Sequence, residues 1–158
     1  MDTKEKVSEK GQTQKHYKNK EKQALKKLRQ LHREKNPGKR IPTYETNTAN
    51  GLTKCIIDYL NMKGQQAERV QCIGAPIPQG NGLYKFGKTT MHRGTADISA
   101  TIKGRSVKIE IKANGDKMSS YQWQYKKDIE QAGGLYFIAH DFVGFLYWIH
   151  QNFKEGKK

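Results

Sequence analysis

The sequence predicts an α/β fold in which helices flank a mixed β-sheet. Three segments place apolar residues at helical spacing, two neighbouring segments alternate apolar and polar residues as strands do, and one short segment is continuously apolar, as a buried strand is. Along the chain the expected order is helix, strand, strand pair, helix, strand, helix. The 158 residues are enough for one domain with a hydrophobic core.

The first part of the predicted domain holds one helix and one strand. Residues 49–63 are expected to form an amphipathic helix that ends before Gly64, and residues 66–73 to form a strand. Residues 74–93 contain several glycines and prolines, which predict a long loop or an irregular hairpin. The apolar face of the helix comprises Leu52, Cys55, Ile56, Tyr59 and Leu60.

Three further strands are expected in the second part. Residues 95–103 and 106–112 alternate in polarity and predict a strand pair with a turn at Gly104–Arg105. Residues 135–139 are continuously apolar, which is typical of a strand that is buried on both faces. The sheet is therefore expected to combine a hairpin with a later strand.

Two further helices complete the domain. Residues 119–132 predict a helix that is capped by Ser119, and Asp141 is expected to cap the last helix. The helix over residues 119–132 has an apolar stripe made of Tyr121, Tyr125, Ile129 and Ala132. The larger aromatic residues that we expect in the core are Trp123, Tyr136, Phe137 and Trp148.

Residues 1–42 predict a basic N-terminal arm, followed by the domain in residues 43–158. Residues 1–40 contain 14 Lys and Arg against 5 Asp and Glu. Few apolar side chains occur in residues 1–20, so we expect the arm to be largely disordered, with a short basic helix over residues 21–35. The arm either grips phosphates or only raises solubility, and the charge pattern leaves both interpretations open.

The net charge points to the class of partner. A formal charge of +15 favours a polyanion, most often nucleic acid, with an anionic membrane surface as the rival. No apolar run is long enough to span a bilayer, and the polar N-terminus lacks the apolar segment of a secretory signal. Cys55 and Cys72 have no CxxC spacing. We therefore expect a cytoplasmic protein that does not enter membranes.

The strand pair is expected to bring two carboxylates together. Val107, Ile109 and Ile111 alternate with Glu110 and its polar neighbours, so that the carboxylate faces away from the core. By the same alternation, Asp97 leaves the core face of the preceding strand. Its distance from the turn places it nearly opposite Glu110, or one diagonal away.

Such a pair of carboxylates suits a hard divalent cation. Mg²⁺ or Mn²⁺ would neutralise Asp97 and Glu110, and the backbone carbonyl of Ile111 could complete the oxygen ligands. Lys112 lies on the same face and could hold an attacking water or stabilise charge on a phosphoryl transition state. The pattern thus predicts phosphodiester hydrolysis.

A plain salt-bridged polar face is the alternative, because this short pattern also occurs by chance. Three neighbouring features favour a site. Gly94–Thr95 allows close backbone approach before Asp97, Asn114–Gly115 ends the strand after Lys112, and Gln122 falls in the first turn of the next helix, whose N-terminus favours phosphate.

Together these motifs resemble the PD-(D/E)xK nuclease superfamily, and more closely its small VRR-NUC branch, related to phage and bacterial nucleases of the Holliday-junction-resolvase type. The resemblance covers about residues 48–150 and implies a restriction-endonuclease-like core. It also implies a metal-dependent endonuclease in which Asp97 and Glu110 bind the metal, Lys112 is the catalytic lysine and Gln122 supports the site. The matching segments are Gly94–Ile98, Ile109–Lys112, Met118–Gln122 and Gly133–Leu135.

The sequence departs from the family pattern at two places. Ala96 stands where the family usually has proline, a residue that takes no part in the reaction. The first helix of the family normally brings a further acid, but the matching region here holds Asn47 and Asn50. Glu45 and Glu68 are the alternative acids, and loss of activity is the other outcome that this departure allows.

The expected partner is DNA, and its backbone is expected to contact a set of basic residues. The preferred interpretation is a Mg²⁺- or Mn²⁺-dependent endonuclease for branched, flapped or otherwise structured DNA, with a homodimer suggested by the two-fold symmetry of a four-way junction. The alternatives are an inactive nuclease-fold DNA-binding protein and an RNA- or ribosome-associated basic protein. The resemblance implies the basic role of Arg69, and the other predicted DNA contacts are Lys85, Lys88, His92, Arg93 and Lys117.

Overall fold

The computed structural model describes residues 3–70, 76–87 and 92–154 of the chain. In chain order the elements are α1 (Thr3–Lys35), α2 (Ala49–Met62), β1 (Gln66–Arg69), β2 (Pro76–Gly80), β3 (Leu83–Phe86), β4 (Ile98–Ile102), β5 (Arg105–Ile111), the short 3₁₀ helix η1 (Ala113–Gly115), α3 (Ser120–Gln131), β6 (Leu135–Ala139) and α4 (Phe142–Asn152).

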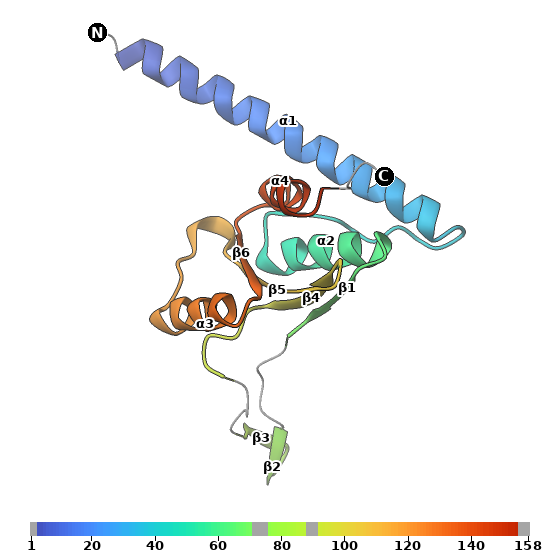
Figure 1. The fold of residues 1–158 in the computed structure, drawn as a ribbon, viewed down its shortest axis with the longest axis vertical. Helices are drawn as coiled ribbons and strands as arrows, with labels where there is room; N and C mark the ends of the chain where they lie inside the picture. Colours follow the sequence, from blue (N-terminus) through green and yellow to red (C-terminus); the bar gives the residue numbers. More distant parts are fainter. Residues whose placement is uncertain (1–2, 71–75, 88–91, 155–158) are drawn as a thin grey trace.

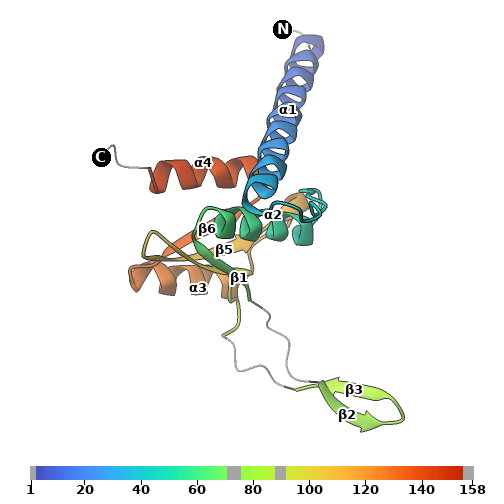
Figure 2. The ribbon, with the colours of Figure 1, turned by 90° about the vertical axis from the view of Figure 1, so that its right-hand side faces the viewer.

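A four-stranded sheet with the order β1-β4-β5-β6 forms the centre of the fold. The β1–β4 and β4–β5 pairs are antiparallel, whereas β5 and β6 are parallel. Helices α2 and α4 lie on one face of this sheet and α3 lies on the other (Figure 1, Figure 2). The predicted α/β class, with a mixed sheet flanked by helices, is confirmed.

The predicted strand pair forms a tight hairpin. Ile98 pairs with Ile109, and Ile102 with Arg105, so the two-residue turn consists of Lys103 and Gly104. Both turn residues have positive φ, at 48° and 78°, which matches the right-handed twist of the strands. The turn therefore lies one residue earlier than predicted.

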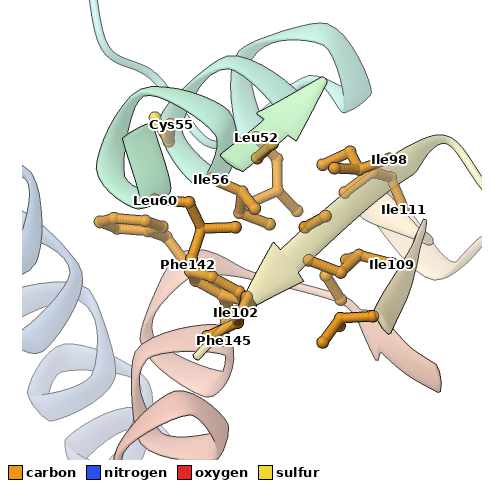
Figure 3. Packing of buried hydrophobic residues seen from close by; sticks show 14 of the residues in the cluster. Leu52, Cys55, Ile56, Leu60, Ile98, Ile102, Ile109, Ile111, Phe142 and Phe145 are labelled. Atoms are coloured by element: carbon orange, nitrogen blue, oxygen red, sulfur yellow. The ribbon is translucent and has the colours of Figure 1, made fainter. Parts of the chain in front are cut away.

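The hydrophobic core lies between the sheet and the helices α2 and α4. The expected apolar face of α2 contributes Leu52, Cys55, Ile56 and Leu60, all at most 1% exposed. The sheet contributes the alternate residues of β4 and β5 that were expected to face inward, and α4 adds aromatic rings. Figure 3 shows the close packing of Leu52, Cys55, Ile56, Leu60, Ile98, Ile102, Ile109, Ile111, Phe142 and Phe145.

The N-terminal arm differs from the prediction. A largely disordered arm with a short helix was expected, but α1 is one continuous helix, and it ends at Lys35 as predicted. Lysine, glutamate and glutamine, which favour helices, dominate this segment. It contains no proline, and the helix continues through Gly11. Ala24 and Leu28 belong to the same hydrophobic core as the rest of the chain, where α1 packs on α2 and α4. The first half of α1 extends away from this body (Figure 1).

Helix α3 has its predicted N-cap, Ser119, but its predicted apolar stripe is only partly covered. None of its residues is buried, and Tyr121 and Trp123 are each 53% exposed. The prediction that Trp123 lies in the core is therefore wrong, and Tyr121 of the predicted apolar stripe is not covered. The half-buried side of the helix consists of Gln122, Tyr125, Lys126 and Ile129, and both rings lie beside it rather than on it. Asp141 caps α4 as predicted, accepting a hydrogen bond from the backbone N–H of Gly144 at 2.7 Å.

The described part of residues 66–93 consists mainly of a short strand and a separate hairpin. Strand β1 ends at Arg69, and residues 71–73 of the predicted strand lie outside the described residues. In the described part of residues 74–93, β2 and β3 pair as an irregular hairpin with a register shift between Pro78 and Gly80. Among the described helices, none has both the length and the apolar character needed to cross a bilayer.

Candidate active site

The β4–β5 register places the two predicted carboxylates side by side. Asp97 immediately precedes β4, and because Ile98 pairs with Ile109, its position is opposite Glu110. The backbone carbonyl of Asp97 accepts a hydrogen bond from the N–H of Val70 at 2.8 Å. Its side-chain oxygen Oδ2 accepts another from the N–H of Ile111, also at 2.8 Å. Asp97 is thus fixed at both its backbone and its side chain.

Glu110 is the buried centre of the cluster, with only 2% of its surface exposed. The ammonium of Lys112 lies 3.0 Å from Oε1 of this carboxylate. The amide Nε2 of Gln122 donates to the same oxygen, and the hydroxyl of Tyr136 donates to Oε2 at 3.4 Å. Three elements, β5, α3 and β6, therefore converge on one carboxylate.

Lys112 is also buried, at 6% exposure, which a lysine tolerates only when it is paired. Besides Glu110, its ammonium approaches Oδ2 of Asp116 at 3.7 Å. Its backbone N–H donates to the carbonyl of Ala139 at 2.8 Å, and Nδ1 of His140 lies 3.0 Å from its own carbonyl. The lysine is therefore held at the end of β5 by contacts to Asp116, which follows η1, and to the end of β6.

The start of α3 positions Gln122. Ser119 and Gln122 form a capping box, in which the Ser119 hydroxyl accepts from the N–H of Gln122 while Oε1 of Gln122 accepts from the N–H of Ser119 at 2.9 Å. The same side-chain amide can then donate through its nitrogen to Glu110. Gly94, with φ of +80°, lies so close to the backbone of Tyr121 and Gln122 that a Cβ there would collide with it. The predicted close approach at Gly94 is thus made to the first turn of α3.

The electrostatics of the cluster favour a cation. Burial raises the pKa of the Glu110 carboxyl, and the negative charge of Asp97 raises it further, whereas the hydrogen bond and charge of Lys112 lower it. Burial and the neighbouring Glu110 also raise the pKa of the Tyr136 hydroxyl. The ionised Glu110 is therefore poorly solvated and depends on nearby positive charge.

The family resemblance predicts a further acid from the first helix, and among the described residues no other carboxylate takes its place beside Asp97 and Glu110. Asn50 of α2 accepts a hydrogen bond from Nη2 of Arg69 at 2.8 Å, so its amide oxygen is engaged. Glu45 accepts a hydrogen bond from Thr48 next to the N-terminus of α2. Glu68 pairs with Ser99, which places it on the α3 face of the sheet, diagonal to Asp97, but exposed. In the described ranges no three His, Cys, Asp or Glu residues cluster as a metal site.

The predicted DNA-contacting residues occupy separate places. Arg69 pairs with Ile98 on the face that α2 covers, away from Glu110. Arg93 stacks its guanidinium on the ring of Tyr121, with Cζ 5.4 Å from the ring centroid. Lys85 lies on the β2–β3 hairpin. His92, Arg93 and Lys117 are exposed, as are Lys85 and Arg69, and Lys88 lies outside the described residues.

Sequence reasoning missed three residues that contact the cluster, namely Tyr136, Asp116 and His140. Tyr136 was expected in the core, and it is indeed buried at 7% exposure, but its hydroxyl points to Glu110. Its hydroxyl carried a signal, because a buried tyrosine usually needs a polar partner for its O–H. The pairing with Lys108 places this hydroxyl on the α3 face. The contacts of Asp116 and His140 follow only from the path of the chain after β5 and β6.

A comparison of the chain with models of protein families finds no match, and a search of curated proteins also finds none. The function proposed for this site therefore rests on the geometry of its residues.

Proposed function

We propose that this chain is a Mg²⁺- or Mn²⁺-dependent endodeoxyribonuclease of the PD-(D/E)xK superfamily, VRR-NUC type, with a restriction-endonuclease-like core. The observation that carries the proposal is the Glu110 cluster: a buried carboxylate lies opposite Asp97, 3.0 Å from the ammonium of Lys112, and receives the amide of Gln122. Four predicted site residues, which come from three segments of the chain, thus lie on the same side of the sheet.

The donor atoms in this cluster fit a hard divalent cation. Two carboxylates stand side by side, and the pKa of Glu110 is raised by burial and by Asp97, so that positive charge is favourable there. Asp97, Glu110 and the carbonyl of Ile111 would hold the ion. Bound there, it would supply Lewis-acid activation of water and of the phosphodiester.

The protein's own residues contribute positioning and charge. Lys112, fixed between Glu110 and the β6 segment, presents an ammonium where negative charge grows during attack on a phosphodiester. Gln122 orients the Glu110 carboxylate through the capping box of α3. Because the N-terminus of α3 points toward this place, it favours the phosphate of the substrate.

A nuclease-fold DNA-binding protein with weak or absent activity is the second candidate. The observation that favours it is the Asn50–Arg69 hydrogen bond, which occupies the amide at the position where a further acid is expected. With two carboxylates instead of three, metal affinity would be lower. The proposed substrate is structured or branched DNA, and a homodimer would match the two-fold symmetry of a four-way junction.

One cleavage assay separates these candidates. The full chain is incubated with labelled four-way junction, flap, linear DNA and RNA, in Mg²⁺, Mn²⁺ or EDTA. We expect metal-dependent cutting of junction or flap DNA that Glu110→Ala abolishes and that Glu130→Ala, an exposed glutamate on α3, leaves intact. Tight DNA binding without cutting in either metal would refute the nuclease and support the second candidate. Preference for RNA would refute both.

A further inference from the structure

The β2–β3 hairpin exposes an aromatic face that nothing in the described chain covers. Every residue of both strands is exposed, including Tyr84 at 64% and Phe86 at 62%. Pro78 pairs with Tyr84 and Pro76 with Phe86, so these four side chains lie on one side of the hairpin. We call them the aromatic face. Lys85, paired with Ile77, lies on the other side.

This hairpin extends from the side of the sheet on which α3 and the candidate site lie. Both views show it projecting away from α1, α2 and α4 (Figure 1, Figure 2). The described residues that precede and follow the hairpin in sequence border the site: the N–H of Val70 binds the carbonyl of Asp97, and residues 92–96 lead directly into Asp97. The hairpin is thus an insertion between two segments that border the candidate site.

An isolated two-stranded hairpin with a bare apolar face gains little stability from its own contacts. Large exposed aromatic rings that lie together on one face are typical of a binding surface. The body also carries an exposed ring beside a cation on α3, where Tyr121 is 53% exposed and the guanidinium of Arg93 lies over its ring. Exposed flat rings on a chain of net charge +15 match a polyanion that also offers flat apolar rings. Unpaired nucleotides have this chemistry.

We propose that the aromatic face binds the unpaired bases of single-stranded DNA, so that the hairpin directs single-stranded segments of the substrate to the candidate site. The assignment of this DNA as a substrate rests on the proposed nuclease function, whereas binding by the hairpin does not require cleavage. Stacking on Tyr84 and Phe86 recognises the planes of the bases and not their sequence.

The test measures binding in EDTA, so that cutting plays no part. Fluorescence anisotropy compares labelled oligo-dT with an abasic strand that has the same number of phosphates. We expect the wild-type chain to bind oligo-dT about tenfold or more tightly than the abasic strand, and Tyr84→Ala/Phe86→Ala to lose this preference while keeping its affinity for the abasic strand. Tyr147→Ala removes an aromatic residue of α4 that is 67% exposed and should change nothing.

Several results would overturn the inference. Equal affinity of the wild type for both strands would show that bases are not recognised. A dimer that the double variant converts into monomers, seen by analytical ultracentrifugation without DNA, would assign the face to a second copy of the chain. If Glu110→Ala keeps the oligo-dT preference while the wild type cuts no DNA, the nuclease proposal fails and the hairpin inference stands.

Discussion

Glu110 and Lys112 form a buried ion pair, a feature whose desolvation cost usually outweighs its attraction unless further hydrogen bonds satisfy both groups. Here Gln122 and Tyr136 supply these bonds to the carboxylate. A pair that serves only stability could be replaced by apolar side chains of the same size. A buried ion pair beside a second carboxylate is the arrangement that the proposed metal site requires.

The buried carboxyl predicts a pH dependence of stability for the metal-free protein. Because burial raises the pKa of Glu110 in the folded state, its protonated form contributes stability at low pH that is lost as pH rises through the folded-state pKa. Relative to Glu110→Gln, which cannot titrate, the wild type should lose free energy of unfolding as pH rises from about 4 toward neutrality. Urea unfolding of both proteins in EDTA across this range measures the difference. A difference that stays constant, or that favours the wild type with rising pH, would contradict the prediction.

Gly94 predicts a coupling between backbone space and activity. A Cβ at this position would collide with the backbone of Tyr121 and Gln122, so Gly94→Ala should shift the first turn of α3 and reduce cleavage. Gly104→Ala is the matched control, because its φ of +78° is similar and its surroundings are open. The control should lose about 1–2 kcal/mol from backbone strain alone, and Gly94→Ala about 1–3 kcal/mol more. Chemical unfolding measures the stability of the two variants, and the cleavage assay measures their activity. If both variants lose the same stability, α3 moves away from the added Cβ without an energetic cost.

At the scale of elements, the hairpin β4–β5 and the helix α3 position different residues of the candidate site. The hairpin sets which residues are neighbours, because its register places Asp97 opposite Glu110. Helix α3 covers the polar face of the sheet and delivers Gln122 from its first turn. The N-terminal cap and the close contact at Gly94 both act on this turn directly.

The cap of α3 should therefore matter more for activity than for stability. Ser119→Ala removes one half of the capping box and should cost about 1 kcal/mol of stability. It should also reduce cleavage, because fraying of the first turn displaces Gln122. Thr48→Ala, which removes the N-cap of α2, is the control with a similar stability loss and unchanged cleavage. Equal activities of the two variants would show that Gln122 does not need the cap.

At the scale of the whole molecule, α1 has two roles along its length. Its second half belongs to the core through Ala24 and Leu28, and it is tied to the body where Arg29 donates to the carbonyl of Tyr44 at 3.0 Å. Deleting residues 1–40 would therefore expose the core as well as remove charge. Substitution of exposed lysines tests the charge alone.

Lys18, Lys22 and Lys26 form one exposed stripe along α1, at a spacing of one helical turn. If this stripe contacts phosphates, replacing all three with Gln should weaken DNA binding at low salt. The slope of log affinity against log salt should then become shallower by up to about 3, since each lost phosphate contact removes about 0.9. Binding titrations at several salt concentrations measure the slope, and thermal unfolding checks that stability is unchanged. An identical slope would leave α1 as a solubilising element.

The sequence by itself determined the local geometry of this protein. Alternation along β4 and β5, the turn near Gly104, the caps Ser119 and Asp141 and the end of α1 at Lys35 all depend on residues close together in the chain. Such features follow from backbone sterics and local hydrogen bonds. For the same reason the proximity of Asp97 and Glu110 could be predicted: only a short turn separates their strands.

Tertiary structure alone decided which surfaces are covered. Periodicity shows that Tyr121 belongs to an apolar stripe, but not that α3 turns Gln122 and Tyr125 toward the sheet and leaves the ring of Tyr121 exposed. Nor does it show that Arg69 turns to α2, or that α1 joins the core. Burial depends on elements that are distant in sequence, and the same long-range packing places Glu110 and Lys112 out of water, which makes an otherwise ordinary polar strand a candidate site.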